Sequence, residues 1–131
     1  MLVDDPKLNQ LTGSILGAAI EVHRVLGPGL LESVYLACLR IELGFRRLRF
    51  IEQQSVPIVY KDVRLNAGYR IDLIVEDCVV VEVKAVDALA PLHQAQVLTY
   101  LKLTGYPAGL LINFNSVRLK DGVRRLLAPR A

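Results

Sequence analysis

The sequence predicts a single α/β domain, in which a mixed β-sheet carries helices packed against it. Apolar residues recur at helical spacing near the start of the chain, and they alternate with polar residues in its middle part. A continuous apolar run, 108–114, follows further on and is typical of a strand buried on both faces. At 131 residues the chain has the length of one domain with one core, so one domain spanning 1–131 is expected.

Two helices are expected first. Apolar positions at helical spacing predict the first over Asn9–Leu26. Gly27-Pro28-Gly29 then breaks the pattern, because proline and glycine disfavour a continuing helix. A second helix is expected over Leu30–Leu43, with Gly44 as its C-terminal stop.

The middle of the chain predicts four strands: 48–51, 56–60, 68–76 and 78–86. The last two alternate most clearly, so that every second side chain shares a face of the sheet. Within 68–76, Ile71, Leu73 and Val75 are expected on one face, and Asp72 and Ile74 on the other.

The last third of the chain predicts a helix, a strand and a helix. Pro91 suits the first turn of a helix that ends near Thr104-Gly105. The buried strand at 108–114 follows, and a short basic helix is expected over Leu119–Leu127. The expected order is therefore α-α-β-β-β-β-α-β-α, which defines an α/β fold with helices on a mixed sheet.

Composition limits the class of protein. Hydrophobic residues make up 53% and charged residues 22%, the opposite of a disordered chain. A net charge of +3 permits a nucleic-acid partner without requiring one. Cys38 and Cys78 form no CxxC pair, which suits reduced thiols in a cytoplasmic protein. The apolar stretch 11–20 is too short to span a membrane, so no membrane partner is expected. A small apolar chain of this kind is compatible with a homodimer.

Three charged residues interrupt the two alternating strands. Glu82 and Lys84 share one face of their strand because the strand period is two, and Asp72 lies in the strand before. A three-residue loop at 76–78 would pair Val75 with Val79 and set Asp72 opposite Glu82. A two-residue loop would turn Asp72 to the other face. Without that pairing, the charges are best interpreted as a solvent-exposed pair on the sheet.

Two directly opposed carboxylates repel each other, so this arrangement makes physical sense when a divalent cation lies between them. Hard oxygen ligands, few in number and completed by water or phosphate, suit magnesium. Such a cation can polarise a phosphate and lower the pKa of a bound water. Lys84 would position that water or stabilise developing negative charge. Asp72, Glu82 and Lys84 therefore predict a divalent-metal phosphodiesterase site.

These residues also carry a family resemblance. Asp72, followed after a gap by Glu82-Val83-Lys84, resembles the signature of the PD-(D/E)XK nuclease superfamily. The segment 29–35 matches the GxxExxY motif, which names one family of that superfamily. The segment 96–100 resembles the QxxxY helix motif of its RecB-like and lambda-exonuclease-like members. The resemblance extends from about residue 11 to residue 127 and implies a restriction-endonuclease-like core.

The resemblance implies a role for each residue of the signature. Asp72 and Glu82 would be metal ligands, with the backbone carbonyl of Val83 as a candidate third ligand, and Lys84 would be the catalytic lysine. The implied activity is a Mg²⁺-dependent nuclease, with Mn²⁺ able to substitute, that uses an activated water to hydrolyse phosphodiester bonds. DNA is the expected substrate. The alternative is a catalytically weak or inactive nucleic-acid-binding module, or an interaction protein, on the same fold.

The resemblance adds a second group of residues around this site. Glu32 would complete the acidic cluster, directly or through water, although a first-turn carboxylate is also favoured by the helix dipole. Gln96 and Tyr100 are four residues apart and so share a helix face that could lean over the site, although a tyrosine there also suits core packing. Whether His23 or His93 joins the site stays open, as do DNA versus RNA, endo versus exo action and the oligomeric state.

Overall fold

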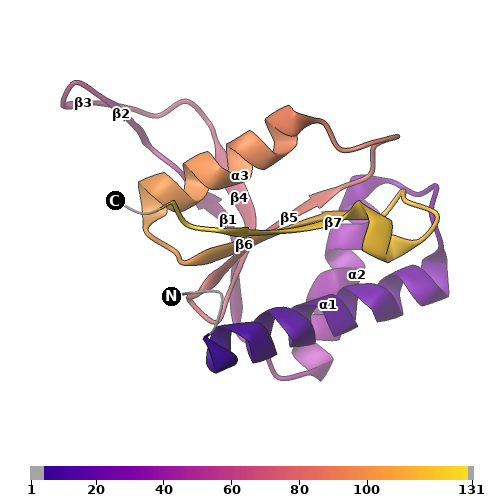
Figure 1. Ribbon diagram of the computed structural model, residues 1–131. Coiled ribbons are helices and arrows are strands. Elements are labelled where there is room, and N and C mark those ends of the chain that lie inside the picture. Colours follow the sequence, from indigo (N-terminus) through magenta and orange to yellow (C-terminus); the bar gives the residue numbers. More distant parts are fainter. Residues whose placement is uncertain (1–4, 130–131) are drawn as a thin grey trace.

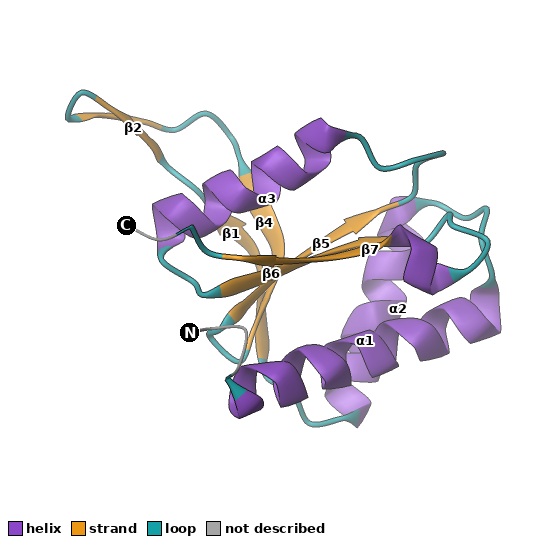
Figure 2. Ribbon diagram, viewed as in Figure 1, coloured by secondary structure: helices purple, strands orange, loops and turns teal. Residues whose placement is uncertain are grey.

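The computed structural model describes residues 5–129, which form three layers (Figure 1). A central sheet has α1 (Pro6–Leu26) and α2 (Glu32–Phe45) on one face and α3 (Pro91–Thr104) on the other. Figure 2 shows the same arrangement by element type, with the strands between the two groups of helices. The expected α/β fold, with helices packed on a mixed sheet in a restriction-endonuclease-like core, is confirmed.

The sheet has five strands in the order β1 (Phe50–Ser55), β4 (Arg70–Val75), β5 (Val79–Lys84), β6 (Ala108–Asn113) and β7 (Val123–Leu127). β5 and β6 run parallel, joined through α3, and the other neighbouring pairs are antiparallel. β6 is buried along its whole length, as the apolar run predicted. A separate two-stranded hairpin, β2 (Ile58–Tyr60) and β3 (Val63–Leu65), projects from the sheet (Figure 1).

The apolar faces of the sheet form two core clusters. On the α1–α2 side, Leu73 and Val81 pack with Tyr35 and other helix residues. On the α3 side, Val80 and Leu111 pack with residues of that helix. Among the described residues, no helix is long and apolar enough to cross a membrane.

Several expected element ends are wrong by a few residues. α1 begins at Pro6 because the carboxylate of Asp5 caps it, accepting hydrogen bonds from two amides of the first turn. α2 begins at Glu32 and continues through Gly44 to Phe45, so Gly44 is not its stop. The strand expected at 48–51 is β1, displaced toward the C-terminus. α3 has the predicted bounds, and Gly105 ends it with a positive φ of 83°.

The helix expected over Leu119–Leu127 is wrong. Residues Leu119–Gly122 form a short 3₁₀ turn, and Val123–Leu127 form β7. Leucine and arginine favour helices in isolation, but β6 has an open edge on this side. Antiparallel pairing with β6 provides hydrogen-bond partners for the backbone groups of that edge, with Gly109 opposite Leu126. Tertiary hydrogen bonding therefore overrides local helix propensity here.

The strand expected over 56–60 is β2, which begins two residues later, at Ile58, whereas β3 was not expected. The chain turns at Lys61 and Asp62, which both have positive φ, and returns as β3 to form the hairpin. Val59 pairs with Arg64, and β3 is exposed throughout. Three exposed residues carry no periodicity signal, which is why β3 was not expected.

Gly109 allows α3 to pack closely on β6. A Cβ atom at this position would lie 2.6 Å from Cγ1 of the buried, β-branched Val97. We expect Gly109→Ala to lower the free energy of unfolding by about 1–3 kcal/mol, because a tightly packed core cannot absorb the added methyl group without shifts. Urea denaturation measures this loss.

The matched control for this prediction is Gly13→Ala. Gly13 is an exposed residue of α1, and nothing lies within 4 Å of the added Cβ. Alanine there should stabilise the protein by about 0.5–1 kcal/mol, since glycine is costly inside a helix. Equal stability changes in the two variants would contradict the close approach of α3.

Candidate active site

The pairing of β4 with β5 sets the position of the charged residues. Val75 pairs with Val79 and Leu73 with Val81, so the next pair in the same register is Asp72 with Glu82. The connecting loop has the three residues that this register requires. Its first two residues have positive φ, and the amide of Cys78 donates to the carbonyl of Val75. Of the two loop lengths that the sequence left open, the structure has the three-residue one.

At this point the carboxylates themselves bridge the two strands. The amide of Asp72 donates to Oε1 of Glu82 at 3.3 Å. In return, the amide of Val83 donates to Oδ2 of Asp72 at 2.9 Å. Each carboxylate therefore accepts a backbone hydrogen bond from the neighbouring strand, and this holds the two acidic side chains together.

The other neighbour of β4 is irregular at the same level. Glu52 pairs with Leu73 and Gln54 with Ile71, while Gln53 between them has a φ of 56°. Ile71 packs in the cluster under α3 rather than with Leu73, so the alternation expected at Ile71 is wrong. A local departure from β geometry beside Asp72 explains this difference.

Glu82 is the buried member of the pair, with 4% of its surface exposed. Burial, the charge of Asp72 and a hydrogen bond with the Asp72 side chain together raise the pKa of its carboxyl to about 9, although Lys84 and the backbone amide of Asp72 act in the opposite sense. The surroundings of Glu82 thus disfavour two negative charges unless a positive charge stronger than that of Lys84 is present. A strongly perturbed carboxyl beside a second carboxyl is characteristic of functional sites.

Lys84 lies at the end of β5, in register with Asn113 of the parallel strand β6. Its carbonyl accepts a hydrogen bond from the amide of Phe114 at 2.9 Å, which fixes the backbone there. The side chain is half-buried. Its positive charge acts on both Glu82 and Glu32, which places the ammonium group among the acidic residues.

Glu32 is the first residue of α2 and faces the same site from the other layer. Burial raises the pKa of its carboxyl; Lys84 and His93 oppose that shift, and Asp72 adds to it. Among residues 5–129, no three His, Cys, Asp or Glu side chains are grouped closely enough to hold a metal ion by themselves. Glu32 therefore lies within electrostatic range of the pair without forming a three-carboxylate cluster.

Tyr35 stabilises the corner that precedes Glu32. Its hydroxyl donates to the carbonyl of Gly27 at 2.6 Å and accepts from the amide of Leu30 at 3.1 Å. Its ring stacks on Phe114, with ring centroids 4.8 Å apart. The tyrosine of the GxxExxY segment thus fixes the loop that leads into α2, and so the position of Glu32.

We expect Tyr35→Phe to lower the free energy of unfolding by about 1–3 kcal/mol, because two polar backbone groups lose their partner while the ring stacking is kept. Chemical denaturation measures this effect. Tyr60→Phe is the matched control, since Tyr60 is 62% exposed on β2. If both variants were equally stable, the hydroxyl of Tyr35 would not hold the corner.

Two asparagines that sequence reasoning did not single out organise the same region. Asn113, only 3% exposed, accepts from the amide of Val86 at 3.0 Å and donates to its carbonyl at 2.9 Å. Asn115 accepts from the amide of Gly29 at 3.0 Å. Together they link the end of β5 to the corner before α2. The available signal was an asparagine inside an otherwise apolar buried run.

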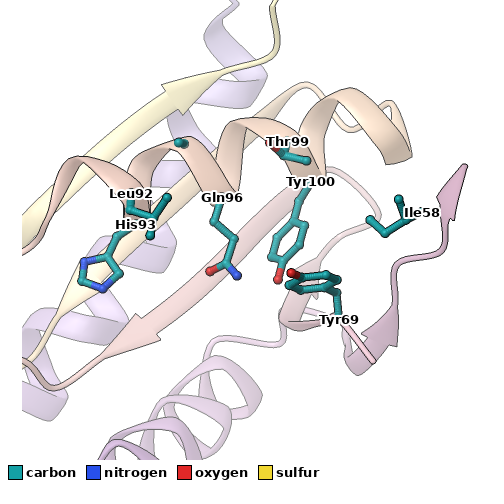
Figure 3. Close-up of a pocket in the computed structure, with 8 residues that line it drawn as sticks. Ile58, Tyr69, Leu92, His93, Gln96, Thr99 and Tyr100 are labelled. Atoms are coloured by element: carbon teal, nitrogen blue, oxygen red, sulfur yellow. The ribbon is translucent and has the colours of Figure 1, made fainter. Parts of the chain in front are cut away.

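Gln96 and Tyr100 lie on α3, which covers the sheet face opposite α1 and α2. Tyr100 is 4% exposed, and burial raises the pKa of its hydroxyl to about 12, with the charges of Glu82 and Asp72 adding to the shift. It is thus a hydrogen-bond donor at neutral pH. Figure 3 shows Gln96 and Tyr100 projecting from the same face of α3, as their spacing predicted.

The two histidines differ in position. His93 lines the same pocket as Gln96 and acts electrostatically on Glu32, and its Nδ1 accepts a hydrogen bond from the amide of Ala90 at 2.9 Å. His23 donates through Nε2 to the carbonyl of Ser116 at 2.8 Å. The contact of His23 favours its interpretation as a structural residue near the end of α1.

A domain of this architecture, with an acidic pair and a lysine on two neighbouring strands, is of the nuclease class. The family model described as the PD-(D/E)XK nuclease superfamily matches residues 9–126. The chain belongs to this superfamily, whose members act on nucleic acid and generally use divalent metals. Comparisons with curated proteins and with solved structures found no match.

Proposed function

We propose that this protein is a metal-dependent nuclease that hydrolyses phosphodiester bonds of DNA. One observation carries the proposal: the carboxylates of Asp72 and Glu82 meet across β4 and β5 beside Lys84, and Glu82 is buried where a second negative charge is disfavoured. Within the superfamily, the positions of Gly29, Glu32 and Tyr35 support placing the chain in the GxxExxY family. We also propose Gln96 and Tyr100 as site residues.

The donor set fits a hard divalent cation. Asp72 and Glu82 would supply carboxylate oxygens, and the carbonyl of Val83 is the third candidate ligand. Glu32, whose carboxyl is affected by the charges of Asp72 and Lys84, would complete the set directly or through water. Mg²⁺ is the proposed ion, with Mn²⁺ as a substitute. A cation bound there would supply charge stabilisation at the phosphate and an acidified water.

The chain's own residues would then orient the reacting groups. The ammonium of Lys84 is placed to hold the attacking water or to donate to a phosphate oxygen as negative charge develops. Tyr100, protonated at neutral pH, can donate a hydrogen bond from the side of α3. The Gln96 amide projects from the same face of α3 and can hydrogen-bond to the substrate.

A cleavage assay tests the proposal. The protein is incubated with linear, nicked and branched DNA, and with RNA, in the presence of Mg²⁺ or Mn²⁺. The expected result is cleavage of DNA that stops on chelation of the metal and in Asp72→Asn. Asp62→Asn, an exposed residue of the β2–β3 turn, is the matched control. Cleavage of RNA alone would overturn the DNA substrate, and metal-independent cleavage would overturn the mechanism.

A further inference from the structure

A pocket lies beside the acidic pair, between α3 and the chain that leads into β4. It has a volume of about 450 Å³, within the range of roughly 300–1,000 Å³ typical of small-molecule sites. Residues of α3 form one wall, and Tyr69 and Ile58 lie across from them (Figure 3). The side chains that matter here are Ile58, Tyr69, Leu92, His93, Gln96 and Tyr100.

Tyr100 lines this pocket and also lies near the acidic pair. Its ring packs edge-on against Tyr69, with centroids 6.5 Å apart and an interplanar angle of 64°. The charges of Glu82 and Asp72 act on the hydroxyl of the same residue. The pocket therefore lies next to the candidate active site, with Tyr100 near both.

The lining of the pocket has a different chemistry from the site beside it. None of the described residues that line it is an aspartate, glutamate, lysine or arginine. It offers aromatic faces and aliphatic side chains, with the amide of Gln96 and the imidazole of His93 as polar groups. A flat, uncharged, aromatic group with polar edges complements this lining, whereas a phosphate does not.

Two side chains at the pocket are open to solvent. Tyr69 is 45% exposed and Leu92 is 77% exposed. Exposed tyrosine faces serve as stacking platforms for bases in proteins that bind single strands. A base inside a duplex is stacked and paired, so it reaches such a platform only after it leaves the helix.

We propose that this pocket receives one unstacked nucleobase, next to the phosphate that a cation bound at Asp72 and Glu82 would hold. Tyr69 stacks on the base, and Gln96 hydrogen-bonds to its polar edge. The substrate class is then single-stranded nucleic acid, or a strand freed at an end or flap, rather than intact duplex. This inference rests on the proposed nuclease function and specifies its substrate.

Equilibrium binding tests the pocket without requiring cleavage. The probe is a short single-stranded DNA that carries a fluorescent adenine analogue, measured with Ca²⁺ in place of Mg²⁺ and compared with a blunt duplex of the same sequence. We expect tighter binding of the single strand. We expect Tyr69→Ala to weaken it about 5- to 150-fold, the range corresponding to one lost base–aromatic stack, and Tyr69→Phe to retain most of the affinity.

Tyr60→Ala is the matched control, because Tyr60 is an exposed tyrosine of β2 that does not line the pocket. Equal binding of duplex and single strand, or equal losses in Tyr69→Ala and Tyr60→Ala, would overturn the base pocket while leaving metal-dependent cleavage intact. The wild type could instead show no metal-dependent cleavage and still prefer single strands in a Tyr69-dependent way. That result would overturn the nuclease function and retain the pocket.

Discussion

Replacing Lys84 with alanine is expected to lower metal-dependent cleavage by roughly 100- to 1,000-fold, the usual cost of removing one donor that stabilises developing charge. Binding of the metal should persist. Lys84 is a positive charge beside Glu82 and Glu32, so its removal makes the site more negative and more attractive to a cation. Single-turnover cleavage measures the first effect, and the metal-induced rise in melting temperature measures the second.

Lys102→Ala is the control for this prediction, because Lys102 is an exposed lysine in the last turn of α3. It should leave both measurements unchanged. If Lys84→Ala cleaved as fast as this control, Lys84 would have no part in the chemistry. If Lys84→Ala lost the metal response as well, its role would be structural rather than catalytic.

Replacing Glu82 with glutamine is expected to have opposite effects on stability and on activity. Glutamine keeps the shape of the side chain and removes a charge that its buried position disfavours. The metal-free protein should therefore become more stable at neutral and alkaline pH. Metal affinity and cleavage rate should both fall by more than roughly 100-fold. A loss of roughly 10- to 100-fold is usual when the residue removed only hydrogen-bonds to a metal ligand.

The sign of the pH dependence follows from the raised pKa of Glu82. The ordinary pKa is 4.5 and the folded-state pKa is about 9. Between these values the folded protein holds a proton that the unfolded chain has lost, so stability falls as pH rises, by at most about 1.4 kcal/mol per pH unit. The stabilisation is complete below pH 4.5 and lost by about pH 9.

Urea denaturation in the presence of a chelator, at pH values from about 5 to about 9, measures this slope. Glu82→Gln should have a shallower slope than the wild type, and Glu52→Gln should not. Glu52 is an exposed glutamate of β1 whose carboxylate pairs with Arg40 at 3.1 Å. A Glu82→Gln variant that is less stable than the wild type at high pH would favour a structural ion pair, and hence the non-enzymatic alternative.

Much of the fold could be predicted because its elements follow from local periodicity. α3 has a proline at its start and a glycine at its end, and β6 is an uninterrupted apolar run. The position of Asp72 opposite Glu82 could be predicted only as a condition, since it depends on a loop of three residues. That condition is met by the pairing of Val75 with Val79.

The remaining features depend on contacts between distant parts of the chain. β7 exists because β6 offers it an open edge. Asn113 and Asn115 act on Val86 and Gly29, 27 and 86 residues away, which no local pattern indicates. Tyr69 precedes β4 and lines a pocket only because α3 packs across the sheet at that level.

The reciprocal hydrogen bonds between β4 and β5 have a consequence for how a cation enters. Asp72 and Glu82 each accept a bond from a backbone amide of the other strand through one oxygen. The second oxygen of each carboxylate keeps its capacity to bind an ion, so an incoming cation competes with the proton held at Glu82 rather than with the amides. The two strands therefore hold both carboxylates in place before the ion arrives, and occupancy of the site should rise with pH.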